Sequence, residues 1–498
     1  MNLRPPATAD VIAGLSVAVV LIPQAMAYAE LAGLPPQVGL FSAALPLIVA
    51  APFVSSPYLQ TGPVALTGLL TFGALAGRAP TFSAEYIELA VLLALMVGIF
   101  RLVLGLARLG TIAYLLSDPV LGGFTTGAAI LILASQLPGA VGAQPTGTGV
   151  LKRAVDTLAS PQSWQAGALL FAGATAALMV GGRRIHRFFP GVFVAVMGAI
   201  LLSAAVGYGG ETIGELPGGF IRPHTVFPWN ESLGLLPAAA AIALVGFAEP
   251  ASIARAFAAQ DRQRWDANKE MVGQGVANIA SALSGGLPVG GSFSRSALGR
   301  MAGAKTAWTG AIAGIIVLFA LPLAPLAEPL PRAVLAAIVI TSVVKLIDLR
   351  SIARLFTVSA PQGVVGLGTL GATLAFAPRV ERGIFVGVAL SIGVHLYREL
   401  NVVADEQVTG STLTISPRGA LWFATVPRIE AICRTKLADD PTIDTIVLDL
   451  AGVGRLDYTG AATLQQSITT FEATGIRVEI INVGPGAKRA ASIHFTPQ

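Results

Sequence analysis

The chain has 498 residues, of which 54% are hydrophobic and only 12% are charged, and its mean hydropathy is +0.72. Soluble globular domains carry roughly 25% charged residues, so a conventional soluble enzyme is excluded and a polytopic membrane protein is indicated. The net charge of +5 lies mainly in short loops between apolar runs. That pattern sets membrane topology and argues against a nucleic-acid partner. One cysteine, Cys433, and four scattered histidines provide neither a disulfide framework nor a metal site.

Apolar runs near the roughly 17–25 residues that a helix needs to cross a bilayer predict 14 transmembrane segments. The first run lacks the basic start and cleavage site of a secretory signal, so we expect it to be retained as a span. We place the segments at residues 11–30, 37–52, 62–76, 85–107, 119–140, 164–181, 190–207, 234–257, 270–286, 292–304, 306–322, 332–346, 359–377 and 382–397.

Two of these segments, 62–76 and 292–304, are too short to cross alone, and each follows a stretch rich in proline or glycine. They occupy equivalent places in two halves of seven helices. An odd number of helices in each half gives the halves opposite topology. Short, interrupted segments at matching places indicate the midplane site of a transporter built from inverted repeats.

Lysine and arginine are concentrated on one side if the N-terminus lies inside, at positions such as Arg101, Arg184, Arg262 and Lys305. Because cytoplasmic loops carry the excess of basic residues, both termini are predicted to be cytoplasmic. The chain is then a multi-pass protein of the inner (plasma) membrane.

The two broken segments begin at residues 62–65 (GPVA) and 291–295 (GSFSR). Free N–H groups and the positive dipole end of each half-helix favour an anion, and Arg295 adds a full positive charge. The alternative is two ordinary helix breaks, with Arg295 reaching to the membrane surface.

Residues 22–29 (IPQAMAYA) resemble the first-helix signature of the sulfate permease family of anion transporters. Residues 62–65 resemble that family's third-helix start, and residues 288–296 (PVGGSFSRS) its tenth-helix signature. This resemblance implies the fold of two inverted seven-helix repeats shared with uracil permeases. In that fold a mobile core domain moves against a gate domain. The gate domain forms the dimer contacts of some relatives, so the resemblance allows a homodimer for this chain.

The resemblance also implies a substrate-binding set on the first, third and tenth helices. For Gln24 and Tyr28 the alternative is helix–helix contact, and for Phe293 it is ordinary packing. The set consists of Gln24, Tyr28, Val64, Ala65, Phe293, Ser294 and Arg295.

Two carboxylates lie in apolar surroundings, where ionised groups are costly. Glu249 is inside the eighth segment, and the resemblance places an acidic residue beside the substrate there. Burial favours its protonated form, so we expect it to couple protons or, as in some relatives, sodium. A fixed ion pair with Arg295 is the alternative. Glu30 closes the first span, where a family acid is associated with proton coupling and the alternative is an interfacial carboxylate.

The C-terminal part alternates predicted strands (412–415, 420–423, 445–450, 478–482) with predicted helices (427–438 and one opening at 457–460), as in a small α/β domain. Asp449, Leu450, Asp457 and Gly460 belong to a pattern that resembles the STAS domain found on these transporters. Thr459 matches the phosphorylated position of soluble relatives, although a helix N-cap is the simpler role. We expect a membrane domain over 1–400 and a cytoplasmic STAS domain over 407–498, with a truncated closing helix.

No catalytic constellation and no phosphate-binding GxxxxGK[ST] loop occurs in the sequence, so neither an enzyme nor an ATP-driven pump is expected, and no cofactor. The prediction is a secondary active transporter with alternating access and proton-coupled uptake. A C4-dicarboxylate such as fumarate is the first substrate expected, then sulfate or bicarbonate. An anion exchanger and a channel-like anion conductor are the alternatives, and sodium is the alternative coupling ion.

Overall fold

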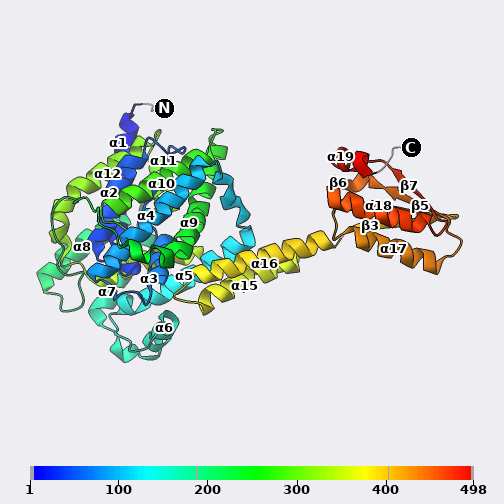
Figure 1. The fold of residues 1–498 in the computed structure, drawn as a ribbon. Coiled ribbons are helices and arrows are strands. Elements are labelled where there is room, and N and C mark those ends of the chain that lie inside the picture. The colour runs from blue at the N-terminus through cyan, green and yellow to red at the C-terminus, as the bar shows by residue number, and fades with distance from the viewer. Residues whose placement is uncertain (1–4, 187–188, 402, 495–498) are drawn as a thin grey trace. The chain divides into compact units, whose positions relative to one another are not determined.

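The computed structural model describes residues 5–186, 189–401 and 403–494. Its close contacts divide the chain into two units, the first ending at Ala389 and the second starting at Leu390. The first is built of helices and two short strands, and the second contains a sheet with helices (Figure 1). The predicted domains 1–400 and 407–498 differ from these units because the helix α16 (Glu381–Leu400) continues through residue 389.

A helix lies over each of the predicted spans. Six helical stretches of the described chain are long and apolar enough to cross a membrane by themselves, so the count of 14 crossings stays a prediction. The first half contains α1 (Thr8–Leu31), α2 (Pro36–Ala50), α3 (Ala65–Leu75), α4 (Ala84–Leu106), α5 (Asp118–Val141), α6 (Val150–Ala159), α7 (Ala166–Ile185) and α8 (Gly191–Val206). The second half contains α9 (Ser232–Gln260), α10 (Ala267–Leu283), α11 (Phe293–Met301), α12 (Trp308–Ala320), α13 (Arg332–Val343), α14 (Leu349–Val358), α15 (Ala360–Ala375) and α16.

Local side chains fix several of the helix ends. The Ser83 hydroxyl caps α4 by accepting the Tyr86 N–H, and the Asp266 carboxylate caps α10 by accepting two backbone N–H groups. Gly142 and Gly207 end α5 and α8 in the left-handed conformation, with φ of 68° and 61°. Glycine has no Cβ to oppose that geometry. These ends follow directly from residue type.

The helices α6 and α14 fall between predicted spans and were missed by the sequence analysis. Each has ten residues and carries basic side chains, so neither passes as a span. Each lies between helices that correspond in the two halves, α5 and α7 for α6, and α13 and α15 for α14. The repeat is therefore visible in the connecting helices as well as in the spans.

Two short strands join the halves. The strand β1 (Gln60–Gly62) pairs antiparallel with β2 (Gly290–Ser292), with Thr61 opposite Gly291. All of their residues are buried. Strand pairing satisfies the backbone groups of this non-helical segment, which would otherwise lack partners at membrane depth.

The helices form two packed groups. The first, here the core group, contains α1–α4 and α9–α12, and the second, the gate group, contains α5, α7, α8 and α13–α15. Within the core group α1 and α2 approach closely at Gly39, where a Cβ would lie 2.0 Å from the carbonyl oxygen of Ala25. Between the groups, α1 contacts α5, α8 and α13, and α3 contacts α5.

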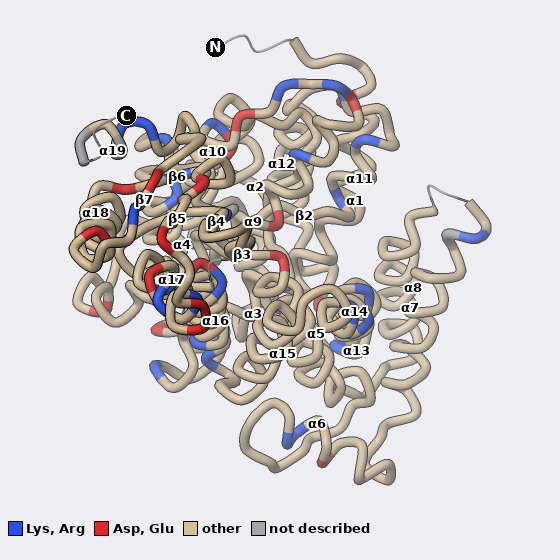
Figure 2. The backbone as a smooth tube through the Cα atoms, turned by 90° about the vertical axis from the view of Figure 1, so that its right-hand side faces the viewer, with Lys and Arg blue, Asp and Glu red and all other residues tan. Residues whose placement is uncertain are grey.

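Charged residues are scarce along the spans. In Figure 2 the helices α7 and α8 are uncharged along most of their length, and Arg184 lies at the end of α7 that leads to α8. Arg187, beside this turn, lies outside the described residues. Arg101 does not fit this pattern: it was assigned to a cytoplasmic loop, but it is fully buried on α4.

The second unit contains a five-stranded sheet in the order β3-β4-β5-β7, with β6 pairing β4. The first pair is antiparallel and the others are parallel. Leucine, isoleucine and valine side chains of the strands and helices make one core, which includes Leu413, Ile446 and Leu464. The elements are β3 (Val403–Thr409), β4 (Thr412–Leu421), α17 (Val426–Asp439), β5 (Thr445–Asp449), β6 (Val453–Leu456), α18 (Tyr458–Glu472), β7 (Arg477–Ile481) and α19 (Pro485–His494).

Several predictions for this unit were wrong in detail. The two strands expected at 412–415 and 420–423 are the single strand β4, and β3 and β6 were not predicted. The closing helix expected after the last strand is α19, with ten residues. The N-cap of α18 is Asp457, whose carboxylate accepts the N–H of Gly460 and the hydroxyl of Thr459, so Thr459 is inside the first turn. Residues 495–498 of the predicted domain lie outside the described residues.

Candidate anion-binding site

The pairing of β1 with β2 brings the starts of two half-helices together. α3 begins at Ala65 after the N-cap residue Val64, and α11 begins at Phe293 after Ser292. A Cβ at Gly290 would lie 3.3 Å from Val64, which shows how closely the two starts approach. Both helix starts present N–H groups and positive dipole ends, so the geometry favours an anion between them.

Arg295 lies in the first turn of α11 and is fully buried. Its Nη1 donates to Oε1 of Gln24 at 3.4 Å, while Nε and Nη2 have no hydrogen-bond partner among the described residues. A Cβ at Gly62 would lie 3.4 Å from Nη2, so the guanidinium reaches the end of β1. A buried cation with open donors is costly unless a ligand completes its hydrogen bonds. A small anion would do so.

The first helix supplies the polar side chains expected on it. Gln24 and Tyr28 are both buried on α1, and Tyr28 is close enough to Arg295 and Glu249 to interact with them electrostatically. Helices α1, α9 and α11 therefore bring Gln24, Tyr28, Glu249 and Arg295 into one cluster.

Glu249 is on α9, directly before Pro250, and is partly buried. It interacts electrostatically with Arg295. In the described part of the chain, Glu249 and Arg295 do not form an ion pair within 4.0 Å. The fixed contact pair considered as the alternative is not formed in this conformation, so the Arg295 charge is not directly neutralised.

The remaining residues of the expected set occupy the helix starts. Val64 and Ala65 are buried at the start of α3. The Phe293 side chain is 58% exposed, and its ring stacks on Phe257 with centroids 6.2 Å apart. Ser294 is exposed, with its hydroxyl 3.3 Å from that of Ser292. Phe293 and Ser294 thus differ from the buried cluster around Arg295.

Glu30 lies apart, at the end of α1, and its contacts were not foreseen. Arg332, the first residue of α13, approaches Glu30 at 3.5 Å and Glu211 at 3.6 Å. This ion pair joins a core-group helix to a gate-group helix. Arg332 was missed because its position at a span end is typical of an ordinary loop cation.

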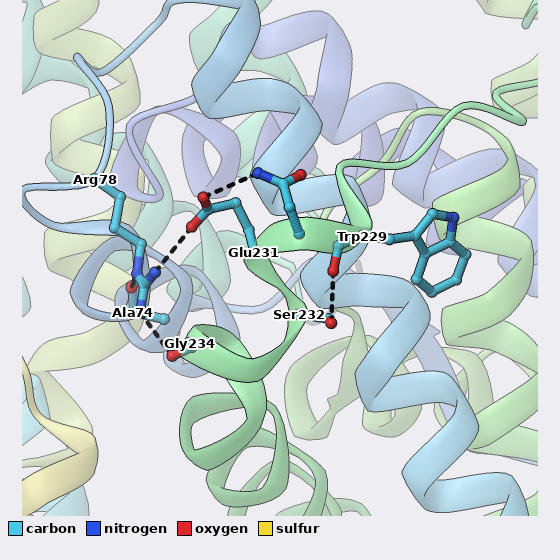
Figure 3. A network of polar contacts seen from close by, with 7 residues as sticks. Ala74, Arg78, Trp229, Glu231, Ser232 and Gly234 are labelled. Carbon is cyan, nitrogen blue, oxygen red and sulfur yellow. Dashed lines mark hydrogen bonds and ion pairs between the residues drawn. The ribbon is translucent and has the colours of Figure 1, made fainter.

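A polar network holds the far end of α3 (Figure 3). Arg78 donates to the carbonyl oxygens of Ala74, at 3.3 Å, and Gly234, at 2.6 Å, and pairs with Glu231 at 3.4 Å. Because Gly234 is in the first turn of α9 and Ala74 is in α3, the network ties together two helices that meet at the site.

Comparisons with known proteins agree with this architecture. The model of the sulfate permease family matches residues 8–368, and that of the STAS domain matches residues 404–494. Sulfate transporter 4.1, chloroplastic, of Arabidopsis thaliana is 32% identical over 515 residues, which cover 95% of this chain and 75% of that protein. A probable sulfate transporter of Mycobacterium tuberculosis is 37% identical over 388 residues, covering 77% of this chain and 69% of that protein.

Two solved structures share the fold. Murine solute carrier 26 family member A9, an anion transporter in the inward-facing state, has a TM-score of 0.90 at 21% identity, covering 99% of this chain and 88% of that one. The transmembrane domain of a cyanobacterial bicarbonate transporter has a TM-score of 0.65 at 23% identity, covering 77% and 97%. From the family match over most of its length, the chain belongs to the sulfate permease family, and it is a multi-pass membrane anion transporter with a C-terminal STAS domain rather than an enzyme.

Proposed function

We propose that this transporter is a secondary active importer that moves sulfate by alternating access together with protons. The observation that carries the proposal is the buried Arg295 at the paired starts of α3 and α11, whose Nε and Nη2 have no hydrogen-bond partner in the described part of the chain. A guanidinium presents a planar fork of donors that suits a tetrahedral oxyanion.

Sulfate is placed first because relatives at 32% and 37% identity are described as sulfate transporters. The small number of membrane cations is what favours a C4-dicarboxylate in the sequence. A carboxylate fits the same guanidinium fork, so fumarate and bicarbonate remain the competitors to measure.

For the movement, the core group would shift against the gate group. The site lies within the core group, since Gln24, Tyr28, Glu249 and Arg295 are on α1, α9 and α11. Rigid-body movement of a group that carries its own binding site gives access to each side in turn. The gate group would supply the contacts of a homodimer. The protein would lie in the plasma membrane, with both termini in the cytoplasm.

Proton coupling would come from Glu249, with Glu30 as the second candidate. An anion bound at Arg295 adds negative charge near Glu249 and so favours its protonation. Thermodynamic linkage makes the effect reciprocal: a proton on Glu249 favours anion binding.

The test is uptake of radiolabelled sulfate into proteoliposomes under an inward proton gradient, an inward sodium gradient or neither. We expect saturable uptake that is faster under the inward proton gradient. Excess unlabelled sulfate should inhibit this uptake more than excess fumarate or bicarbonate does. Uptake driven only by sodium, or only by an anion on the opposite side, would replace symport with the sodium or exchange alternative. Non-saturable flux that follows voltage alone would identify a channel-like conductor.

A further inference from the structure

Arg101, near the C-terminal end of α4, is fully buried, and each of its three guanidinium nitrogens has a hydrogen-bond partner. Its Nε donates to the carbonyl oxygen of Ala243 at 3.1 Å, and its Nη2 to that of Ile242 at 3.0 Å. Its Nη1 donates to the carbonyl oxygen of Val289 at 2.9 Å. Among the described residues, no carboxylate forms an ion pair with Arg101.

These three carbonyl groups belong to the elements that carry the anion site. Ile242 and Ala243 lie on α9, about two turns before Glu249. Val289 directly precedes β2, which leads into α11 and Arg295. One guanidinium therefore bridges the helix of the candidate proton carrier and the segment of the candidate anion ligand.

The surroundings are shaped for this arginine. A Cβ at Gly246 on α9 would lie 2.5 Å from Nη2 of Arg101, so only glycine lets the guanidinium approach the helix without a shift. Asn278 on α10 holds the same segment from another side. Its Nδ2 donates to the Val289 carbonyl oxygen at 3.1 Å, and its Oδ1 accepts the Val289 N–H at 2.9 Å.

We propose that Arg101 is a positioning residue for anion transport, which fixes α9 and the start of β2 relative to each other and so sets the place of Glu249 against Arg295. This inference rests on the proposed anion site. An arginine suits the task because its guanidinium donates in several fixed directions, whereas the ammonium of lysine is a single point on a flexible stem. A buried charge without a carboxylate partner is a costly way to achieve stability alone.

The experiment compares Arg101→Met, Arg101→Lys and Gly246→Ala with the parent in the sulfate uptake assay. Gly246→Ala keeps the arginine but pushes it away from α9. Arg153→Met is the matched control, because Arg153 is exposed on α6. For each protein we would measure KM, the maximal rate, the stimulation by an inward proton gradient, and thermal stability in detergent.

We expect KM to rise at least tenfold in Arg101→Met, with proton stimulation weakened, and to rise less in Arg101→Lys and Gly246→Ala. The control should behave like the parent. If the variants that fold keep the KM and the proton stimulation of the parent, the positioning role is overturned. The same conclusion holds if only their thermal stability and maximal rate fall. If Arg101→Met does not fold, Arg101→Lys and Gly246→Ala decide by the same criteria. Absence of sulfate uptake by the parent would instead refute the proposed function, and this inference with it.

Discussion

Two buried arginines of the core group differ in how their donors are used. Each of the three guanidinium nitrogens of Arg101 donates to a backbone carbonyl oxygen. Arg295 makes one long hydrogen bond to Gln24 and leaves Nε and Nη2 open among the described residues. An arginine whose three nitrogens all donate to the protein holds structure, whereas one with partnerless nitrogens can bind a ligand. This contrast supports the proposed roles of Arg101 in positioning and of Arg295 in anion binding.

Replacing Arg295 by alanine should weaken sulfate binding at least about tenfold, because hydrogen bonds to a charged group contribute about 1.5–3 kcal/mol and 1.4 kcal/mol corresponds to tenfold. Arg295→Lys should retain part of the affinity, since it keeps the charge but not the planar fork. Binding can be measured by sulfate-dependent thermal stabilisation of the purified protein. Normal uptake by a well-expressed Arg295→Ala protein would remove Arg295 from the site.

Glu249→Gln should bind sulfate but lose the acceleration by an inward proton gradient, because glutamine resembles the protonated carboxyl group and cannot release a proton. Glu30→Gln tests the second carboxylate in the same vesicles. Its additional effect should be a loosened contact with Arg332, which now faces Glu30 at 3.5 Å. If both variants keep full stimulation, neither residue couples protons and symport through these carboxylates fails.

At the scale of elements, backbone contact between helices sets the geometry of the core group. Where α2 passes α1, Gly39 leaves no room for even a methyl group, because a Cβ there would meet the Ala25 carbonyl oxygen at 2.0 Å. Ala25 is next to Gln24, so this crossing also fixes the part of α1 that contacts Arg295. Small residues at helix crossings permit such close packing in membranes.

Gly39→Ala should therefore destabilise the protein by about 1–3 kcal/mol, the usual cost of overpacking, and should lower sulfate affinity as α1 shifts. The matched control is Gly173→Ala on α7, where a Cβ would meet nothing within 4 Å. That control should be neutral or slightly stabilising, since alanine favours helix over glycine. Thermal unfolding in detergent compares the two. Equal melting temperatures would show that α1 and α2 do not need this close approach.

The positions of most helices and of the breaks before α3 and α11 could be predicted from the sequence, because long apolar runs and glycine- or proline-rich breaks are local patterns. The contacts of Arg101 and Arg332 could not, because a basic residue near a span end is compatible with a loop as well as with a buried contact. β3 escaped detection since its residues are mostly exposed and show no alternation. β6 has only four residues, too few for a pattern.

At the scale of the whole molecule, the two units have separate cores. The strands and helices of the second unit share one hydrophobic cluster, including Leu413, Leu448 and Leu464. The strand pair β1–β2, which joins the two halves of the helices, lies within the first unit. We therefore expect each unit to fold without the other.

Deleting residues 407–498 should leave an inserted membrane protein that transports sulfate with an altered rate or altered trafficking. Size-exclusion chromatography and uptake by the truncated protein provide the measurement, with the full chain reconstituted in parallel. An aggregated or uninserted product would contradict the division into domains and make the STAS domain necessary for folding.

The strand pair β1–β2 also has a consequence for how the protein is made. Its partners are far apart in the chain, since Gln60 faces Ser292 and Gly62 faces Gly290. During synthesis the first half reaches the bilayer with an unpaired strand, and that edge finds its partner only after the ribosome has delivered the second half. Until then the exposed backbone is costly in lipid. The nascent first half should consequently depend on insertion factors or chaperones to shield this edge, and the transport site cannot form before β2 and Arg295 have been synthesised.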